Sequence, residues 1–245
     1  TYGLTQEEAM RFRLPCGGVM RLVVEPVRQA DWVRKVLERI SRHQLVRRDL
    51  DLKTLQVTIN EGFPEDTITY NNGTLATVFG PRWQMLIIGA GQVSSYLARM
   101  AQALDYNVIV CDPREEMRET WDVADTTLSK EMPDDAVLTL PVNNRTAVIA
   151  LTHDPKLDVM ALLEALKSSA FYVGAIGSKS NNDKRRQRLA LFDLTEEEIG
   201  RLHGPVGLNI SSRTPPEIAI AILAELIQVR SEQKKTASLS ANCNM

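Results

Sequence analysis

Residues 84–94 of the 245-residue chain read QMLIIGAGQVS, an apolar run that ends in two glycines separated by one alanine. Residues 85–88 have the length of a buried strand, and residues 93–104 have the apolar periodicity of an α-helix. In such a strand–turn–helix unit, Gly89 makes the tight turn and Gly91 lets the backbone approach a pyrophosphate. The N-terminus of the helix then offers free N–H groups and the positive end of its dipole to that anion. These residues predict a Rossmann-like unit.

The alternation of strands and helices continues after this unit. Apolar runs predict three further strands, at residues 107–111, 147–151 and 171–175. Two further helices are expected, at residues 157–167 and 215–229. Continuous apolar strands that alternate with helices are covered on both faces, which is typical of a parallel sheet. We therefore expect an α/β fold with a Rossmann-like domain over residues 81–230.

The two ends of the chain differ from this pattern. In residues 1–80, β-prone runs at 20–24, 55–59 and 67–70 accompany a helix expected at 32–43 with Asp31 as its cap. The dipeptide at residues 80–81, Gly-Pro, predicts a boundary there, so we expect a smaller α+β domain before it. Residues 231–245 are polar and lack periodicity, which predicts a disordered tail.

The composition excludes several classes of protein. The chain is 44% hydrophobic and 24% charged with a net charge of −2, as expected for a globular protein. This balance argues against nucleic acid or a membrane surface as the main partner, because both attract a basic face. No apolar stretch approaches the ~20 residues that span a bilayer, and no signal peptide is recognisable. Three isolated cysteines, at positions 16, 111 and 243, indicate a reducing cytoplasm.

Polar residues follow two of the predicted strands. Asp112 stands 21 residues after Gly91, where a carboxylate can accept hydrogen bonds from ribose hydroxyls. His153 follows the strand at 147–151, and ligands of open parallel sheets bind beyond the carboxyl ends of the strands. We therefore expect His153 in or near the ligand crevice. Its neighbour Asp154 is explained as a helix N-cap.

A second glycine-containing turn follows the strand at 171–175. Gly174 and Gly177 expose backbone N–H groups, and Ser178 and Lys179 add a hydroxyl and a cation that suit a phosphate. The basic run that follows is explained as a solvated helix face, at least for Arg186 and Arg188. The three histidines, at 43, 153 and 203, have no metal-ligand spacing, so no metal site is expected.

Cys16 is the remaining candidate for chemistry. It stands before two glycines in the sequence LPCGG, on backbone that we expect to be open. A thiol there can meet a ligand or carry sulfur if its pKa is lowered. A buried structural cysteine is the alternative, and spacing alone does not decide between them.

Several of these stretches together resemble the XdhC/CoxI family, the accessory proteins of molybdenum hydroxylases. The matching motifs occur in family order: LPCGG at 14–18, GAGQV at 89–93, DPR at 112–114, THD at 152–154, YVGAIGSK at 172–179, PVGLNI at 205–210 and TPPEIA at 214–219. The family's usual N-terminal domain is longer and carries a second Gly-Gly-Cys segment, so we expect the domain at 1–80 to be partial.

The resemblance implies a chaperone for molybdenum cofactor rather than an enzyme. Such a protein binds the pyranopterin or its cytosine dinucleotide form, protects it and delivers it to an apoenzyme of the xanthine dehydrogenase or aldehyde oxidase type. It also implies a sulfurtransferase partner of the cysteine desulfurase type, a homodimer, and Cys16 as the contact to molybdenum or transferred sulfur. The expected cofactor-binding residues are Gly89, Gly91, Gln92, Val93, Asp112, Arg114, His153, Gly174, Gly177, Ser178 and Lys179.

Two other functions remain open at this point. In an NAD(P)-dependent oxidoreductase, Asp112 would bind the ribose, which favours NAD, and His153 would donate a proton. Against it, the chain shows no lysine, tyrosine and serine set of a reductase. In a nucleotide-sensing module, the same fold would bind a ligand without chemistry.

Overall fold

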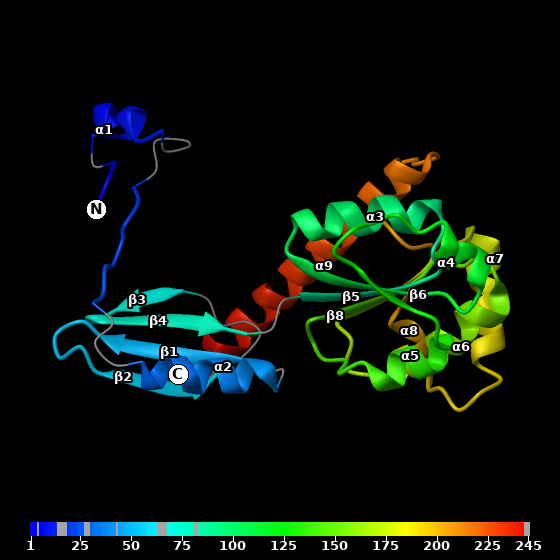
Figure 1. Ribbon diagram of the computed structural model, residues 1–245, viewed down its shortest axis with the longest axis horizontal. Coiled ribbons are helices and arrows are strands. Elements are labelled where there is room, and N and C mark those ends of the chain that lie inside the picture. Colours follow the sequence, from blue (N-terminus) through cyan, green and yellow to red (C-terminus); the bar gives the residue numbers. More distant parts are fainter. Residues whose placement is uncertain are drawn as a thin grey trace.

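The computed structural model describes residues 1–3, 5–13, 19–26, 30–42, 44–62, 68–80 and 83–242, with side chains up to residue 232. Figure 1 shows two sheets that lie side by side along the chain's long axis. The first is a four-stranded sheet with the order β2-β1-β4-β3, and the second a six-stranded sheet with the order β10-β9-β8-β5-β6-β7.

The first sheet is antiparallel. Its part of the chain contains α1 (Gln6–Arg11), α2 (Asp31–Ser41), β1 (Val46–Asp51), β2 (Val57–Glu61), β3 (Thr69–Asn71) and β4 (Thr74–Phe79). Helix α2 packs on β1 and β2. Val36 of the helix and Val46 and Leu50 of β1 are buried, so the apolar positions of β1 alternate as in a half-covered strand.

Arg48 is a buried cation in this small core. It lies between Val46 and Leu50 on the covered face of β1, donates to both carboxylate oxygens of Glu25 and stacks over Trp32 at 4.2 Å. Pairing with a carboxylate and an aromatic face offsets the cost of burying the charge. Because a charged residue occupies a covered position, the sequence of β1 does not show the alternation of apolar and polar residues that is typical of a half-covered strand.

The predictions for residues 1–80 are therefore correct only in part. Residues 20–24 were expected to form a strand, but Met20 makes a single bridge to Tyr2 and residues 21–26 are irregular. Asp31 is the first residue of α2 rather than its cap, and it pairs with Arg34 at 3.2 Å. Strands β1 and β4 were not predicted.

The second sheet is parallel at every pairing. It contains β5 (Trp83–Ile88), α3 (Gln92–Ala103), β6 (Tyr106–Cys111), α4 (Glu115–Glu119), β7 (Thr127–Ser129), α5 (Pro133–Thr139), β8 (Thr146–Ala150), α6 (Pro155–Lys167), β9 (Tyr172–Ala175), α7 (Lys179–Leu189), α8 (Glu196–Gly200), β10 (Leu202–His203) and α9 (Pro215–Asn242). This confirms the predicted α/β class with a Rossmann-like parallel sheet.

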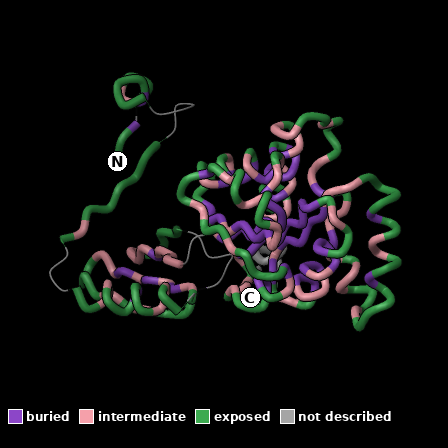
Figure 2. Tube along the Cα trace, turned by 45° about the vertical axis from the view of Figure 1, so that its right-hand side comes forward, coloured by how far each residue is buried: buried purple, intermediate pink, exposed green. Residues whose placement is uncertain are grey.

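The central strands are buried on both faces, as their continuous apolar runs require (Figure 2). One face forms a core with α3 and α9, which contains Leu97 and Ile222. The other face forms a core with α5 and α6, which contains Val137 and Leu162. Strand β5 lies in the middle, between β6 and β8. The chain adds β6 and β7 on one side of β5 and then β8, β9 and β10 on the other, so the strand order reverses at the β5–β8 pair.

Helix α9 is longer than predicted. It runs from Pro215 to Asn242, whereas the sequence predicted an end at residue 229 and a disordered tail from 231. Residues 230–242 contain no proline or glycine, so no helix-breaking residue stops the helix. The helix thus continues 13 residues beyond the end that the sequence predicted. No helix in the described part of the chain is both long and apolar enough to cross a membrane.

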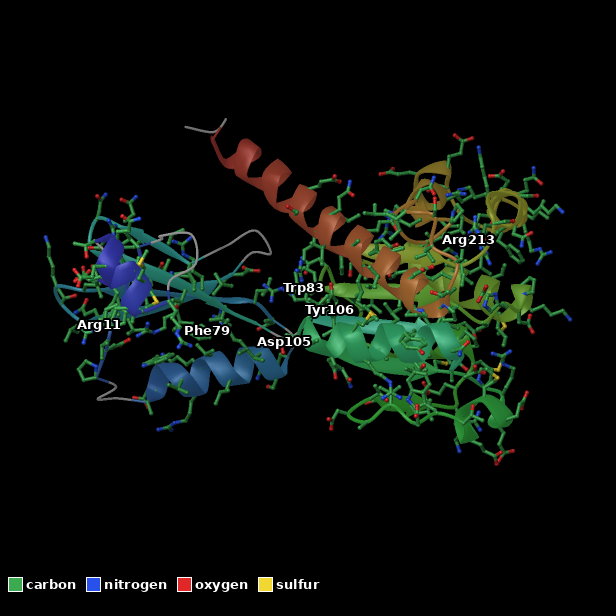
Figure 3. The ribbon with its side chains drawn as sticks, turned by 90° about the horizontal axis from the view of Figure 1, so that it is seen from above. Arg11, Phe79, Trp83, Asp105, Tyr106 and Arg213 are labelled. Atoms are coloured by element: carbon green, nitrogen blue, oxygen red, sulfur yellow. The ribbon has the colours of Figure 1, made fainter. Side chains whose placement is uncertain are left out.

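The amino ends of the strands in the second sheet face the first sheet. Figure 3 labels Trp83 and Tyr106, the first residues of β5 and β6, at the end of the second sheet that faces Phe79 of β4, whereas Arg213, in the loop before α9, lies at the opposite end. Trp83 packs edge-on against Phe171, with Arg145 and Arg230 over its ring. The carboxyl edge of the second sheet therefore points away from the first sheet.

Gly89 permits the close approach of β5 and β8 at the carboxyl edge. Its φ is +106°, and a Cβ atom there would lie 2.9 Å from Cα and 3.0 Å from N of Thr152. The left-handed backbone and the lack of space both require glycine.

We expect Gly89→Ala to lower the free energy of unfolding by about 3 kcal/mol or more, because backbone strain and a clash with Thr152 add together. Urea unfolding measures the change. Gly73→Ala is the matched control: its φ is +83° but the nearest atom to a Cβ, Lys53 Cε, is 4.0 Å away, so about 1 kcal/mol is expected. Equal losses in the two variants would contradict the role of the Gly89–Thr152 approach.

Candidate functional site

The carboxyl ends of the parallel strands bring together most of the predicted site residues. Loops after β5, β6, β8 and β9 contain residues 89–91, 112–114, 151–154 and 176–178. The β5–β8 pair is the topological switch point, where ligands bind in sheets of this kind. Gly89, Gly91, Asp112, Arg114, His153, Gly177 and Ser178 all belong to these loops.

The N-terminus of α3 has no side-chain cap. Gly91 is the N-cap residue, with φ −89° and ψ −176°, and no side chain among the described residues caps the helix. Gln92 is exposed, and Val93 packs partly on the core, so these two residues offer the site mainly their backbone N–H groups. By contrast, Asp154 caps α6 and the Ser178 hydroxyl caps α7 by accepting from Asn181 N at 3.2 Å.

Asp112 ties the β6 loop to the glycine turn. Its Oδ2 accepts from Ala90 N at 2.8 Å and from Arg114 Nη2 at 2.8 Å. Its Oδ1 accepts from the backbone N of Arg114 at 3.1 Å and from Nε at 2.9 Å. The side chain is fully buried. Burial alone would raise the pKa of Asp112, but hydrogen bonds from Arg114 and Ala90 hold it below its ordinary value.

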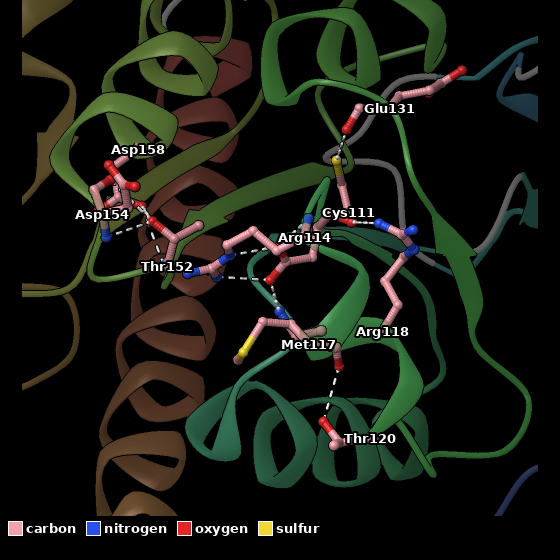
Figure 4. A network of polar contacts seen from close by, with 11 residues as sticks. Cys111, Arg114, Met117, Arg118, Thr120, Glu131, Thr152, Asp154 and Asp158 are labelled. Atoms are coloured by element: carbon pink, nitrogen blue, oxygen red, sulfur yellow. Dashed lines mark hydrogen bonds and ion pairs between the residues drawn. The ribbon is translucent and has the colours of Figure 1, made fainter.

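A second buried carboxylate joins the β8 and β9 loops. Asp158 Oδ1 accepts from the Thr152 hydroxyl at 2.6 Å (Figure 4). Its Oδ2 pairs with Arg185 Nη2 at 3.0 Å. Arg185 also donates to the carbonyl of Ile176 at 3.0 Å. Burial raises the pKa of the Asp158 carboxyl, and the Thr152 hydroxyl and Arg185 oppose this. The network fixes the relative positions of the two loops.

Sequence reasoning did not find Asp158 or Arg185. A charged residue between the apolar Leu157 and Val159 was an available signal for Asp158. Arg185 stands in a run of cations and could not be distinguished from its neighbours. Arg186, explained from the sequence as a solvated residue, instead donates to the carbonyls of Leu202 and Gly204, at 2.8 and 3.1 Å.

His153 is exposed in the β8 loop and has a φ of +60°. Lys179 is the exposed first residue of α7. Gly174 lies inside β9 rather than in a loop, where a Cβ would lie 2.6 Å from Val206 Cγ2 and 2.7 Å from Tyr172 Cε1. Packing therefore explains Gly174, which does not belong to the loops at the carboxyl edge.

Within the described residues the one cysteine is Cys111, and it does not belong to the loops of the site. Cys16 lies outside the described residues. Cys111 is buried, its thiol donates to the carbonyl of Glu131 at 3.2 Å, and burial raises its pKa to about 12. Such a thiol is inert at neutral pH. Among the residues that the structure describes, no three His, Cys, Asp or Glu side chains gather as metal ligands would.

A third carboxylate, Glu225 of α9, holds the loop after β10. It accepts from Tyr172 OH, from Gly207 N at 2.7 Å and pairs with His203 Nδ1 at 2.9 Å, while His203 stacks on the Tyr172 ring. Burial alone would raise the pKa of Glu225, but the hydrogen bonds from His203, Tyr172 and Gly207 lower it. The carboxylate is thus stabilised in its charged form.

A groove of about 1660 Å³ lies elsewhere, beside α2 and β2. Its lining residues include Trp32, Arg39 and Asn60 together with side chains of both charges. No residue predicted to bind a ligand lines it. The carboxyl edge of the second sheet remains the candidate site.

The parallel sheet and the glycine turn at its switch point define a Rossmann-type domain. The model of the XdhC Rossmann domain matches residues 85–226, and the chain belongs to the XdhC family. This confirms the resemblance found in the sequence.

Curated relatives support the same assignment. The chain is 26% identical over 227 residues, 92% of its length, to the molybdenum cofactor insertion chaperone PaoD of Escherichia coli (strain K12). It is 33% identical over 156 residues, 63% of its length, to the uncharacterized protein YqeB of the same organism. It is 26% identical over 152 residues, 61% of its length, to a probable xanthine dehydrogenase subunit of Bacillus subtilis (strain 168). The alignments span 64% of PaoD, 28% of YqeB and 44% of the Bacillus subtilis protein, so the chain covers less than two thirds of each relative.

A solved structure shares the fold. The crystal structure of a xanthine dehydrogenase from Bacillus halodurans superposes with a TM-score of 0.66 at 23% identity. The match covers 85% of this chain and 67% of that one.

We expect Glu225→Gln to lower the free energy of unfolding at pH 7 by about 1–3 kcal/mol, because hydrogen bonds to a charged acceptor are lost. The pKa of Glu225 is lowered on folding, so its contribution is complete above the unfolded value of about 4.5 and disappears as the pH falls through the folded value. Urea unfolding from about pH 6 to about pH 3 should therefore show a steeper acid loss for the wild type than for the variant. Parallel pH profiles would contradict this role of Glu225.

Proposed function

We propose that this chain binds molybdenum cofactor at the carboxyl edge of its parallel sheet, protects it and hands it to a molybdenum hydroxylase apoenzyme. Membership of the XdhC family and similarity to PaoD, a molybdenum cofactor insertion chaperone, support the proposal. The cofactor is a cargo, so no reaction step of this chain is required. The proposal concerns a carrier rather than an enzyme.

The observation that carries the proposal is the unused space at Gly91. A Cβ atom there would meet only the flexible end of Met117, at 3.9 Å, and φ is negative, so the fold itself does not require glycine. The residue stands at the uncapped N-terminus of α3, beside free N–H groups. A phosphate of the cofactor that approaches this backbone would explain why a side chain is absent.

Other predicted residues have suitable positions for the remainder of the ligand. His153 and Lys179 are exposed at the loops after β8 and β9, and Arg114 is partly exposed after β6. We propose that these side chains surround the cofactor, with Gly177 and Ser178 contributing backbone groups. The networks of Asp112 and Asp158 keep the loops in place before the ligand arrives, which reduces the ordering cost of binding.

Finer parts of the proposal rest on the family resemblance. We propose the pyranopterin or its cytosine dinucleotide form as the ligand, a client of the xanthine dehydrogenase or aldehyde oxidase type, and a cysteine desulfurase-type sulfurtransferase as partner. Cys16 would contact molybdenum or the transferred sulfur. A homodimer, a cytoplasmic location and separate domains at 1–80 and 81–230 complete this description.

The alternative of an NAD(P)-dependent oxidoreductase receives less support. It assigns the ribose hydroxyls to Asp112, but both carboxylate oxygens of Asp112 already accept hydrogen bonds and the side chain is buried. A titration with NADH serves as the control for this function.

We expect Gly91→Ala to weaken binding of molybdenum cofactor at least about tenfold, because its methyl group would occupy the path of the phosphate. The free energy of unfolding should change by no more than about 1 kcal/mol, since the backbone angles suit alanine. An anaerobic fluorescence titration measures binding, and urea unfolding measures stability.

Gly200→Ala is the matched control, because a Cβ at this residue of α8 would meet nothing within 4 Å. It should leave cofactor binding unchanged and raise the free energy of unfolding by no more than about 1 kcal/mol, because alanine suits a helix better than glycine. Cofactor binding that is equally tight in Gly91→Ala and wild type would contradict the proposed site. Saturable NADH binding without cofactor binding would contradict the proposed function as a whole.

A further inference from the structure

The turn after β6 holds a guanidinium in a fixed orientation. Arg114 Nε and Nη2 donate to the two carboxylate oxygens of Asp112, at 2.9 and 2.8 Å, in a bidentate pair. Such a fork–fork pair defines both the position and the plane of the guanidinium. Because Asp112 also accepts from Ala90 N, the cation is tied to the glycine turn before α3.

Asp112 has no capacity left for a ligand hydroxyl in this arrangement. Its two oxygens accept four hydrogen bonds, which fills the approximate capacity of a carboxylate. Its side chain has no exposed surface. The sequence predicted that Asp112 contacts the ligand, but this geometry assigns Asp112 to holding Arg114.

Arg114 retains donors for a ligand. A guanidinium has five N–H groups, and the pair with Asp112 uses two of them. Nη1 makes no hydrogen bond to any residue that the structure describes, and 29% of the side chain is exposed. Figure 4 shows Arg114 extending from the β6 loop toward Thr152, across the switch point.

We propose that Arg114 binds a phosphate group of the ligand and makes this site selective for phosphate-bearing ligands, with Asp112 as its positioning residue. The inference rests on the proposed function, which it deepens by naming the ligand chemistry. Two sources of that chemistry are possible, the phosphate of a pterin and the pyrophosphate of a nucleotide. Arginine suits both because its planar fork matches phosphate oxygens.

The test is a calorimetric titration of the full chain with CDP, cytidine and inorganic pyrophosphate at low salt, in parallel with an anaerobic titration of molybdenum cofactor. Arg114→Gln should weaken binding of CDP and pyrophosphate by about 10- to 100-fold, as expected for loss of a charge-assisted hydrogen-bonded pair. Cytidine, which lacks phosphate, should bind equally weakly to wild type and variant. Arg114→Lys should recover part of the loss, because it restores the charge but not the fork.

Arg99→Gln is the control for the change in net charge. Arg99 is an exposed residue of α3 that pairs with Asp122 at 2.7 Å, and it belongs to none of the carboxyl-edge loops. This variant should bind every probe like the wild type. Circular dichroism and urea unfolding of each variant verify that the fold is intact.

Several results would overturn the inference. They are unchanged CDP affinity in Arg114→Gln, an equal loss for CDP and cytidine, or failure of the wild type to bind any phosphate probe. If molybdenum cofactor binds tightly and equally to wild type and Arg114→Gln, the inference fails while the proposed function stands. If CDP binding depends on Arg114 but the cofactor does not bind, the proposed function fails and the selectivity of Arg114 stands.

Discussion

The close approach of two backbone segments at Gly89 and Thr152 is the constraint on which the site depends. Parallel strands β5 and β8 lie next to each other, and their loops leave the sheet in different directions. A side chain at Gly89 would be 2.9 Å from Thr152 Cα and would push the loops apart. Because glycine stands there, the turn before α3 and the β8 loop lie close together at the carboxyl edge.

Two buried carboxylates and one partly buried carboxylate then fix the loops at that edge. Asp112 holds the β5 and β6 loops, Asp158 holds the β8 and β9 loops together through Arg185, and Glu225 holds the loop after β10. Each carboxylate is paired or accepts several hydrogen bonds, which offsets the cost of its burial. This arrangement builds a preorganised edge from loops, which would otherwise be mobile elements.

The sequence predicted the parallel sheet well because each central strand is covered on both faces and is therefore continuously apolar. It failed at β1, where buried Arg48 interrupts the alternation, because only a tertiary pair with Glu25 makes that burial acceptable. The extension of α9 was missed because polarity was taken as a sign of disorder, although helix propensity depends on the absence of Gly and Pro as well.

The sequence predicted where the candidate site lies, but it did not predict which of its residues hold the loops in place and which are available to a ligand. Their positions after strands predicted that Asp112, Arg114 and His153 lie at the carboxyl edge, and the structure places them there. The contacts of Asp112 with Ala90 and Arg114 come from side-chain geometry, which spacing does not encode. Likewise, the pairing of Asp158 with Arg185 joins residues 27 positions apart.

The central claim is that the carboxyl edge at the switch point binds the cofactor. Hydrogen exchange of the full chain, followed by mass spectrometry with and without molybdenum cofactor under anaerobic conditions, tests it most directly. The account predicts that protection appears in peptides that contain residues 89–94, 112–115, 151–154 and 176–179. Protection confined to peptides of the first sheet, with unchanged exchange in these loops, would contradict it.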